Sequence, residues 1–465
     1  MAGLFDTLSL GSRSLDTYRK AIDTTGHNLA NVNTPGYTRQ RLLIEATTVD
    51  GGAWGPIGTG SEAVKIVQLK NAAATKQLQT EASIEGSLAV KQDALQQAQV
   101  FLQESIDRNG TTGTNTKGIS QGLADFFAAA QSVATTPGSL AERAVFLEKA
   151  QDLATKFNTV DSRLASLQGS LNERVTAEVG QANGLLQEIA NLNEAIISEE
   201  ALSTGFANDL RDTRQLKLEE LSKLAKIDTA EQENGAINVS IGGTLLVEGR
   251  EVSNTLESFD SGDGSMLVRV TGQSAALPVT GGSIHGAISV RDGEITALRE
   301  QINTLAATFI TEVNGVHAQG FGLEGSTGAN FFNGTNAADI AVNPALLSDP
   351  KLYQAAGVTG EAGDNTVAKG IASLFTAKHP ALDGLSFSNK QAQTVAGLGQ
   401  QVASTNSELA DQKTISQFVR DQRDAVSGVS IDEEMTNLIM FQSAFQASAK
   451  LISMTDEMLA TIIEM

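Results

Sequence analysis

The sequence predicts a mainly α protein with a small inserted β domain and paired heptad helices at its two termini, which form a coiled coil. Apolar residues recur in steps of four and three near both ends of the 465-residue chain, and helical spacing extends over 140–202. At Ile227 the period changes from helical to strand-like. We therefore expect nested, discontinuous domains. A terminal coiled-coil domain combines 1–45 with 427–465, an elongated helical rod domain combines 46–226 with 285–426, and the β domain occupies 227–284.

Composition and charge exclude several classes of function. The formal net charge is −21, and Lys and Arg do not cluster, so we expect no binding to nucleic acid. The absence of cysteine removes disulfides, thiolate catalysis and thiolate metal sites. We expect no membrane span and no cleavable signal peptide, because neither a long apolar run nor an apolar signal core occurs. Aromatic residues make up 5% of the chain, which favours an aliphatic interior.

The amino-terminal helix is predicted from a heptad seam that ends at a turn. Its seam positions are Leu4, Leu8, Gly11, Leu15, Tyr18, Ile22, Thr25, Leu29 and Val32. Pro35 keeps Thr34 out of the helical conformation, because the proline ring clashes with a helical residue before it. Pro35 and Gly36 then suit the two central positions of a type II turn that ends at Tyr37.

The interior of the chain alternates extended segments with helices. Helical spacing predicts helices near 71–107, 119–133, 140–202, 209–225, 283–316, 366–375 and 389–426, and extended segments are expected at 37–45, 64–69 and 340–342. The helix over 140–202 would be on the order of 90 Å long at about 1.5 Å per residue. An element of that length indicates a rod.

The inserted β domain is predicted from alternating apolar residues. Ile237, Val239 and Ile241 alternate up to Gly242 and Gly243, which indicates a hairpin with a two-glycine turn. Two further strands are expected over 266–270 and 277–280.

The carboxy-terminal helix carries the second heptad seam. Its positions are Ile431, Met435, Leu438, Gln442, Phe445, Ala449, Ile452, Asp456, Leu459 and Ile463. Ser430 and Glu433 are expected to form a capping box, and Asp432, Glu433 and Glu434 place negative charge at the positive end of the helix dipole. The seam needs a partner. It fits either an intramolecular coiled coil in an ordinary globular protein or contacts between copies, and Gln442 and Asp456 are places where neighbouring copies would set the contact.

No catalytic or cofactor-binding pattern is present, so we expect no enzyme activity and no cofactor. The four histidines are far apart and lack partners at metal-ligand spacing, which favours structural roles. Ser283 suits a helix N-cap better than a nucleophile, and the acidic loop after Asp260 lacks the closing Glu of a calcium site. Neither a phosphate-binding loop nor a dinucleotide fingerprint occurs.

Motifs at both ends resemble those of the bacterial flagellar axial proteins, which include rod, hook and hook-associated members. The amino-terminal motif runs from Asn28 to Gln40, and its signature residues are Asn31, Asn33, Thr34, Pro35, Gly36 and Tyr37. The carboxy-terminal motif comprises Ser427 to Glu434 and then Asn437, Leu438, Phe441, Gln442 and Phe445. The long central helix, and Asn314, His317 and Gly320 ahead of paired phenylalanines, are most similar to the hook-associated family of the hook-filament junction.

The resemblance implies a structural subunit that polymerises in a helical ring and links hook to filament, outside the cell. It implies an inner tube of terminal helices, and contacts with the hook protein and the second hook-associated protein. It also implies export through the flagellar type III apparatus, with a chaperone on the carboxy-terminal helical region. Phe445 and Met440 depart from the residues that are frequent in the family. An alternative is another axial subunit, from hook, distal rod or the second junction protein.

Overall fold

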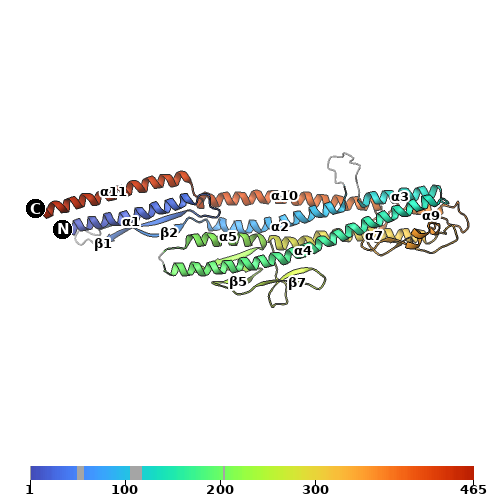
Figure 1. Ribbon diagram of the computed structural model, residues 1–465, viewed down its shortest axis with the longest axis horizontal. Coiled ribbons are helices and arrows are strands. Elements are labelled where there is room, and N and C mark those ends of the chain that lie inside the picture. Colours follow the sequence, from blue (N-terminus) through green and yellow to red (C-terminus); the bar gives the residue numbers. More distant parts are fainter. Residues whose placement is uncertain (1, 50–56, 105–117, 203–204, 465) are drawn as a thin grey trace.

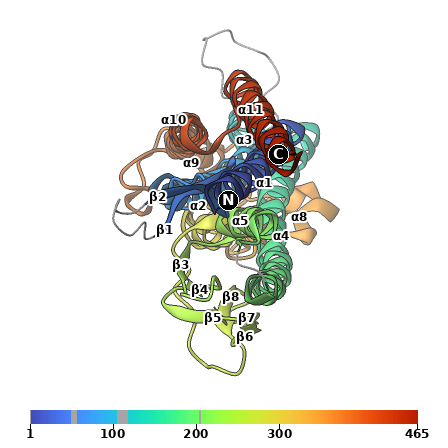
Figure 2. The same ribbon diagram turned by 90° about the vertical axis from the view of Figure 1, so that its left-hand side faces the viewer.

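The computed structural model describes residues 2–49, 57–104, 118–202 and 205–464. The molecule is a long rod in which both chain ends lie at the same end (Figure 1). Viewed along the rod, the strands β3 to β8 project from one side of the helices, and α10 and α11 lie on the other side (Figure 2). The predicted fold class, mainly α with a small β insertion, is confirmed.

The end that holds both termini consists of two helices and a β ribbon. Helix α1 (Ala2–Ala30) lies beside α11 (Ile431–Glu464), and strands β1 (Gln40–Val49) and β2 (Ile57–Gln68) pair antiparallel along α1. Helix α1 ends before Val32, which therefore lies in the turn and not on the helical seam. Since β2 begins well before the predicted 64–69 and packs on α1, we propose that the terminal domain extends to about residue 68.

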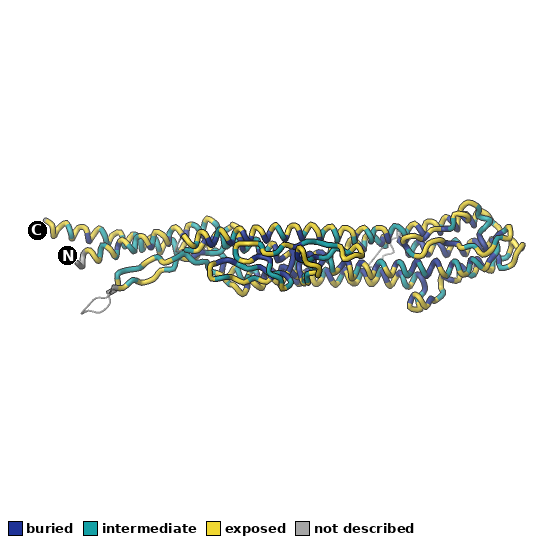
Figure 3. The backbone as a smooth tube through the Cα atoms, turned by 90° about the horizontal axis from the view of Figure 1, so that it is seen from below, coloured by how far each residue is buried: buried dark blue, intermediate teal, exposed yellow. Residues whose placement is uncertain are grey.

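Long helices form the rod. They are α2 (Ala72–Leu102), α3 (Ile119–Thr135), α4 (Leu140–Leu202), α5 (Asn208–Leu224), α7 (Thr296–His317) and α10 (Phe387–Ser427). Helix α4 has the predicted bounds and contains 63 residues. The apolar residues that recur at helical spacing in its middle are all buried: Leu153, Phe157, Val160, Leu164, Leu167 and Leu171. Buried residues continue along the inside of the rod, whereas the terminal helix pair is mostly half-buried or exposed (Figure 3).

The far end of the rod holds an aromatic cluster, contrary to the expected aliphatic interior. The rings of Phe126, Phe309, Phe331 and Phe332 contact one another and are fully buried. Short elements surround them: β9 (Phe332–Asn333), β10 (Ala341–Val342), α8 (Pro344–Ser348), η3 (Pro350–Leu352), α9 (Thr366–Ser373) and η4 (Pro380–Leu382). The few aromatic residues of the chain are therefore concentrated where irregular segments, and not parallel helices, must fill space.

The β domain contains a four-stranded sheet and a separate hairpin. The sheet has the order β3 (Ile227–Glu231), β4 (Ile237–Ile241), β5 (Thr244–Glu248), β6 (Glu251–Val252), and β7 (Leu256–Asp260) pairs with β8 (Met266–Val270). The two-glycine turn is confirmed, with φ of +57° at Gly242 and +80° at Gly243. The predicted strand over 277–280 is absent, because Pro278 has no N–H to join a ladder.

Helix α4 holds the β domain through three asparagines on one face. Asn183 Nδ2 donates to Leu256 O and its Oδ1 accepts from Leu256 N, and Asn193 brackets Ile237 in the same way. Asn172 donates to Gly264 O and accepts from Met266 N. The spacings of 11 and 10 residues return to one side of a helix.

The predicted helix over 283–316 is divided into three parts. Helix α6 (Gly282–Val290) continues through a π-helical turn, η2 (Arg291–Ile295), into α7. Arg291 lies in this turn, is buried, and donates from Nη1 to Asn172 Oδ1 and Met266 O. The π turn therefore places one side chain against both α4 and the β domain.

Candidate functional site

The terminal helices pack antiparallel in a close crossing. A Cβ added at Gly11 would lie 2.6 Å from Ile452 Cγ1, so glycine lets the two helices approach. The Tyr18 and Phe441 ring centroids are 6.5 Å apart. Asn28 Nδ2 donates to Glu434 Oε2 over 3.0 Å, so the pairing extends almost to the end of α1.

The residues of α11 that are buried or half-buried against α1 define a contact seam. Its positions, in steps of four and three, are Glu434, Leu438, Phe441, Phe445, Ser448, Ile452, Thr455 and Leu459. Asn437, Ala444 and Leu451, which lie beside this seam, are also half-buried. Four residues of the contact seam, Leu438, Phe445, Ile452 and Leu459, also belong to the predicted seam. Of the other predicted positions, Met435, Gln442, Ala449 and Asp456 each follow a residue of the contact seam by one position. Gln442 and Asp456 are exposed. The reason is that α11 is apolar around most of its circumference. Heptad spacing in the sequence therefore fits the predicted seam as well as the contact seam.

The predicted seam residues of α1 lie on a helix that packs against both α11 and the β1–β2 ribbon. Leu8, Leu15, Ile22 and Leu29 are half-buried, and the side chain of Leu4 is outside the described residues. The fully buried residues of α1 are small or polar, and they meet both the ribbon and α11. Thr17 Oγ1 donates to Ser61 O over 3.1 Å, and Gly11 lies against Ile452. Whether the predicted seam residues act in assembly stays a prediction.

Much of α11 remains apolar and uncovered. Large exposed side chains are Ile431, Met435, Ile439, Met440, Met454, Met458, Ile462 and Ile463, with exposed fractions from 42% to 82%. Helix α1 is the element that packs along α11, and it covers one side of it. A surface helix of a monomer is normally polar on the side away from its partner.

The signature turn has the predicted type II geometry. Tyr37 N–H donates to Thr34 O over 3.2 Å, and Gly36 has φ of +76°. Asn31 Nδ2 donates to His27 O, and Thr34 Oγ1 donates to Asn31 Oδ1. Asn33 and Pro35 are exposed. The turn therefore ends α1 and directs the chain into β1.

Arg39 joins the signature segment to the first turn of α11. Its Nη1 lies 2.6 Å from Glu433 Oε2, and its Nε and Nη2 each lie 2.7 Å from Glu434 Oε1. The Glu434 side chain is 3% exposed, and Arg39 N–H also donates to Ser427 O over 2.8 Å. Burial alone would lower the pKa of Arg39, but the bonds to both glutamates outweigh burial and raise it.

This arrangement corrects the interpretation of the acidic cluster as a helix cap alone. Glu433 binds Arg39 and does not complete the predicted capping box with Ser430. Asp432 and Ser430 are exposed and keep their expected place at the helix start. Periodicity could not find the ion pair, because its partners lie 394 and 395 residues apart.

A second polar network connects the turn to α5. Asn28 Oδ1 accepts from the Tyr37 hydroxyl over 2.8 Å and from Gln40 N–H over 2.9 Å. Thr38 N–H donates to Asp212 Oδ2 over 2.9 Å. Burial raises the pKa of Tyr37, and the charges of Asp209, Asp212 and Glu434 raise it further. Burial also raises the pKa of Asp212, against the two hydrogen bonds from Thr38.

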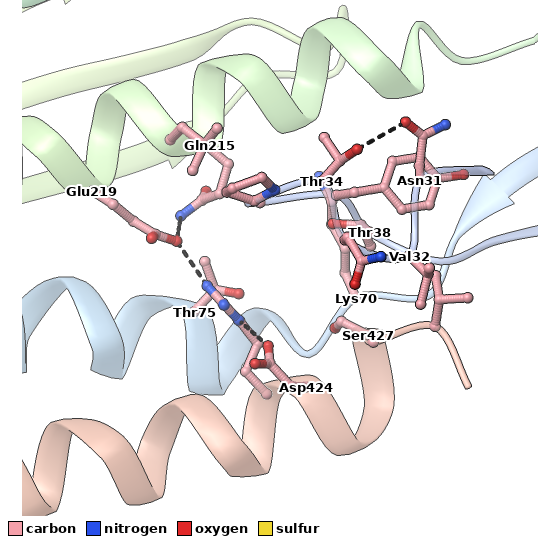
Figure 4. Close-up of a pocket in the computed structure, with 18 residues that line it drawn as sticks. Asn31, Val32, Thr34, Thr38, Lys70, Thr75, Gln215, Glu219, Asp424 and Ser427 are labelled. Atoms are coloured by element: carbon pink, nitrogen blue, oxygen red, sulfur yellow. Dashed lines mark hydrogen bonds and ion pairs between the residues drawn. The ribbon is translucent and has the colours of Figure 1, made fainter. Parts of the chain in front are cut away.

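A cleft of about 500 Å³ lies where these elements meet the end of α10 (Figure 4). It is lined by the signature turn, α5, Lys70 and the α10–α11 junction. Arg423 is one of the residues that line it, and it pairs with Glu219 over 3.0 Å and Asp424 over 2.9 Å. The lining therefore carries paired charges, and it joins the terminal helices to the rod.

Neither a metal site nor a membrane span is found in the described parts of the chain. No group of three or more metal-binding side chains occurs among residues 2–49, 57–104, 118–202 and 205–464. Of the helices in those ranges, none is both long and apolar enough to cross a membrane.

Comparison with known families shows which class of protein this chain is similar to. Sequence models of three families match the chain: "Flagellar hook-associated protein FlgK helical domain" over 107–332, "Flagellar basal body rod FlgEFG protein C-terminal" over 422–465, and "Flagella basal body rod protein" over 10–38. Segments of the chain are thus similar to domains of flagellar rod and hook-associated proteins. The last two matches cover the terminal helices and the signature turn described above.

Individual relatives identify the similarity more closely. The chain is 27% identical to flagellar hook-associated protein 1 of Bacillus subtilis, over 100% of this chain and 98% of the relative. It is 22% identical to flagellar hook-associated protein 1 of Escherichia coli, over 97% of each. The solved structure of the flagellar hook junction protein FlgK from Burkholderia pseudomallei has a TM-score of 0.48 and 25% identity, over 56% of this chain and 46% of that chain. The resemblance predicted from the terminal motifs is confirmed by the sequence matches, and with it a structural role in the flagellum.

Proposed function

We propose that this chain polymerises at the hook-filament junction and links hook to filament, without catalysing a reaction. The observation that carries this proposal is the uncovered apolar surface of α11, which includes Ile439 at 60% exposure and Ile463 at 82%. Leaving such side chains in water forgoes roughly 1.5 to 3 kcal/mol of burial for each. Contacts with further copies would recover it.

The shape of the molecule supports a helical array. Both terminal helices lie at one end of the rod, so the ends of many copies can gather around an axis while the rods point away from it (Figure 1). A contact that repeats from copy to copy without closing generates a helix. In this proposal the terminal helices of the domain formed by residues 1 to about 68 and 427–465 build the inner tube, and Arg39 and the signature turn fix the angle between tube and rod.

The proposed partners are those that the resemblance to the flagellar axial proteins implies. They are further copies of this chain, the hook protein and the second hook-associated protein, with an export chaperone on the carboxy-terminal helical region. The proposed location is the extracellular flagellum, reached through the type III export apparatus without a cleaved signal. A hook or rod subunit would share the terminal motifs, but the match of 107–332 to the hook-associated helical domain favours the junction.

Complementation of a bacterial strain that lacks its junction protein tests this function. The wild-type chain should restore attached filaments. Ile439→Glu places a charge on the uncovered side of α11 and should abolish attachment, whereas Val358→Glu changes a side chain of similar exposure (56%) at the far end of the rod and should not. Thermal unfolding of both purified variants should match the wild type. Normal export of the wild-type chain without filament attachment would overturn the assignment.

A further inference from the structure

Methionine is concentrated on the helix whose surface is uncovered. Five of the seven methionines of the chain lie between residues 435 and 465. Three of them, Met440, Met454 and Met458, are 54%, 50% and 48% exposed. A thioether is flexible and apolar, and it suits a surface that must fit a partner.

These three residues belong to a second heptad seam, which we name the methionine seam. It comprises Met440, Ala444, Ala447, Leu451, Met454 and Met458, in steps of four, three, four, three and four. Each position precedes one position of the contact seam by a single residue, which turns the seam by roughly 100° around the helix. Met440 is one of the residues that line a cleft between α1, α11 and the ribbon, and Phe441, Leu42 and Leu69 also line it.

We propose that Met440, Met454 and Met458 are an oxidation site, and that their conversion to sulfoxides in the free chain blocks assembly. In each step the thioether sulfur attacks an oxygen of a peroxide, the O–O bond breaks and an S–O bond forms. The sulfur loses two electrons and hydrogen peroxide is reduced: the leaving hydroxide takes the proton of the transferred hydroxyl group and departs as water, which leaves the sulfoxide. The oxidant is therefore a peroxide, such as hydrogen peroxide, which accepts two electrons.

The consequence follows from the change in polarity. A sulfoxide is polar and larger than a thioether, so three sulfoxides on one helix face would place unpaired dipoles in a contact that excludes water. The chain has no cysteine that could react first. This inference rests on the proposed function, because it assigns the seam to the contacts between copies.

The experiment treats the full-length chain with hydrogen peroxide and then measures polymer growth by light scattering and electron microscopy. Peptide mass spectrometry should show sulfoxides at Met440, Met454 and Met458 before Met266, which is half-buried in the β domain. Oxidation should raise the critical concentration for polymerisation by at least about tenfold. Methionine sulfoxide reductase should restore it.

Matched variants separate the seam from the other methionines. The triple variant M440L/M454L/M458L keeps volume and apolarity, so it should polymerise equally well before and after peroxide. Met435→Leu changes an exposed methionine outside the seam and should remain sensitive. Equal growth of oxidised and untreated wild type would overturn the inference, as would inhibition of the triple variant to the wild-type extent. Failure of the untreated chain to polymerise would instead overturn the proposed function, and this inference with it.

Discussion

Replacing Arg39 by alanine should release α11 from the signature segment. The substitution removes three contacts of 2.6 to 2.7 Å to Glu433 and Glu434. Glu434, with its side chain 3% exposed, would keep one hydrogen bond, from Asn28 Nδ2 at 3.0 Å. Removing one partner of a buried ion pair costs about 3 to 5 kcal/mol, because the other charge stays buried without compensation. The contact with Glu433 adds little, because that side chain is 63% exposed.

The loss should appear as local opening of the terminal pair. At about 3 kcal/mol, the open population of α11 increases about a hundredfold. Trypsin cleavage at Lys450, which lies on α11, reports that population when reclosing is faster than cleavage. Cleavage at Lys450 should therefore accelerate by about two orders of magnitude, while unfolding of the rod stays unchanged.

Two further variants make the test specific. Lys20→Ala removes an exposed ion pair with Asp16 on α1 and should change cleavage less than about threefold. The double variant R39M/E434L replaces both partners with apolar side chains and should recover most of the protection. If Arg39→Ala were cleaved no faster than Lys20→Ala, the ion pair would not hold α11.

Three other predictions concern the rod and the β domain. The free energy of unfolding should fall by up to about 3 kcal/mol as pH decreases from about 6.5 to 4. The reason is that burial lowers the pKa of His317 to about 4 in the folded chain, whereas the unfolded chain takes up the proton at the ordinary pKa. In denaturant titrations, His317→Gln should remove this pH dependence. Asn193→Ala should cost about 1 to 3 kcal/mol in thermal unfolding, because it removes both side-chain partners of the half-buried backbone N–H and C=O of Ile237, whereas the exposed Asn191→Ala should have little effect. Gly286→Ala should destabilise by about 1 to 3 kcal/mol, since its Cβ would lie 2.5 Å from Ser87 O, and Gly169→Ala, with open space around it on α4, should stabilise by about 0.5 to 1 kcal/mol in the same assay.

Elements whose signals are local were predictable from the sequence. Helix α4 begins after Pro137 and Gly138 and keeps one apolar face over its length, so its bounds follow from spacing alone. The Gly242–Gly243 hairpin and the type II turn at Gly36 depend on glycine at positions with positive φ. Strand β7 was missed because Leu256 and Phe259 do not alternate with period two.

Features that depend on distant partners were not predictable. Glu434 looks like part of a helix dipole until Arg39 is placed beside it, and the two are 395 residues apart. Hydrophobic spacing does not mark the asparagines of α4. Their role becomes visible only when the strands to which they hydrogen-bond are placed beside them. In both cases the signal is the pairing itself, which a single sequence does not contain.

Helix α11 carries more apolar surface than its contact with α1 requires, and this matters more for function than the exact residues of any one seam. A helix that served α1 alone would need one apolar stripe, yet the predicted seam, the contact seam and the methionine seam run in neighbouring registers of the same helix. Gly11 and Arg39 select the register that meets α1, because one admits Ile452 closely and the other binds Glu434. The exposed methionines of the methionine seam, and the exposed positions of the predicted seam, have no partner of that extent in the described chain. Apolar surface in excess of what one partner can cover supports the proposal that further copies complete the site.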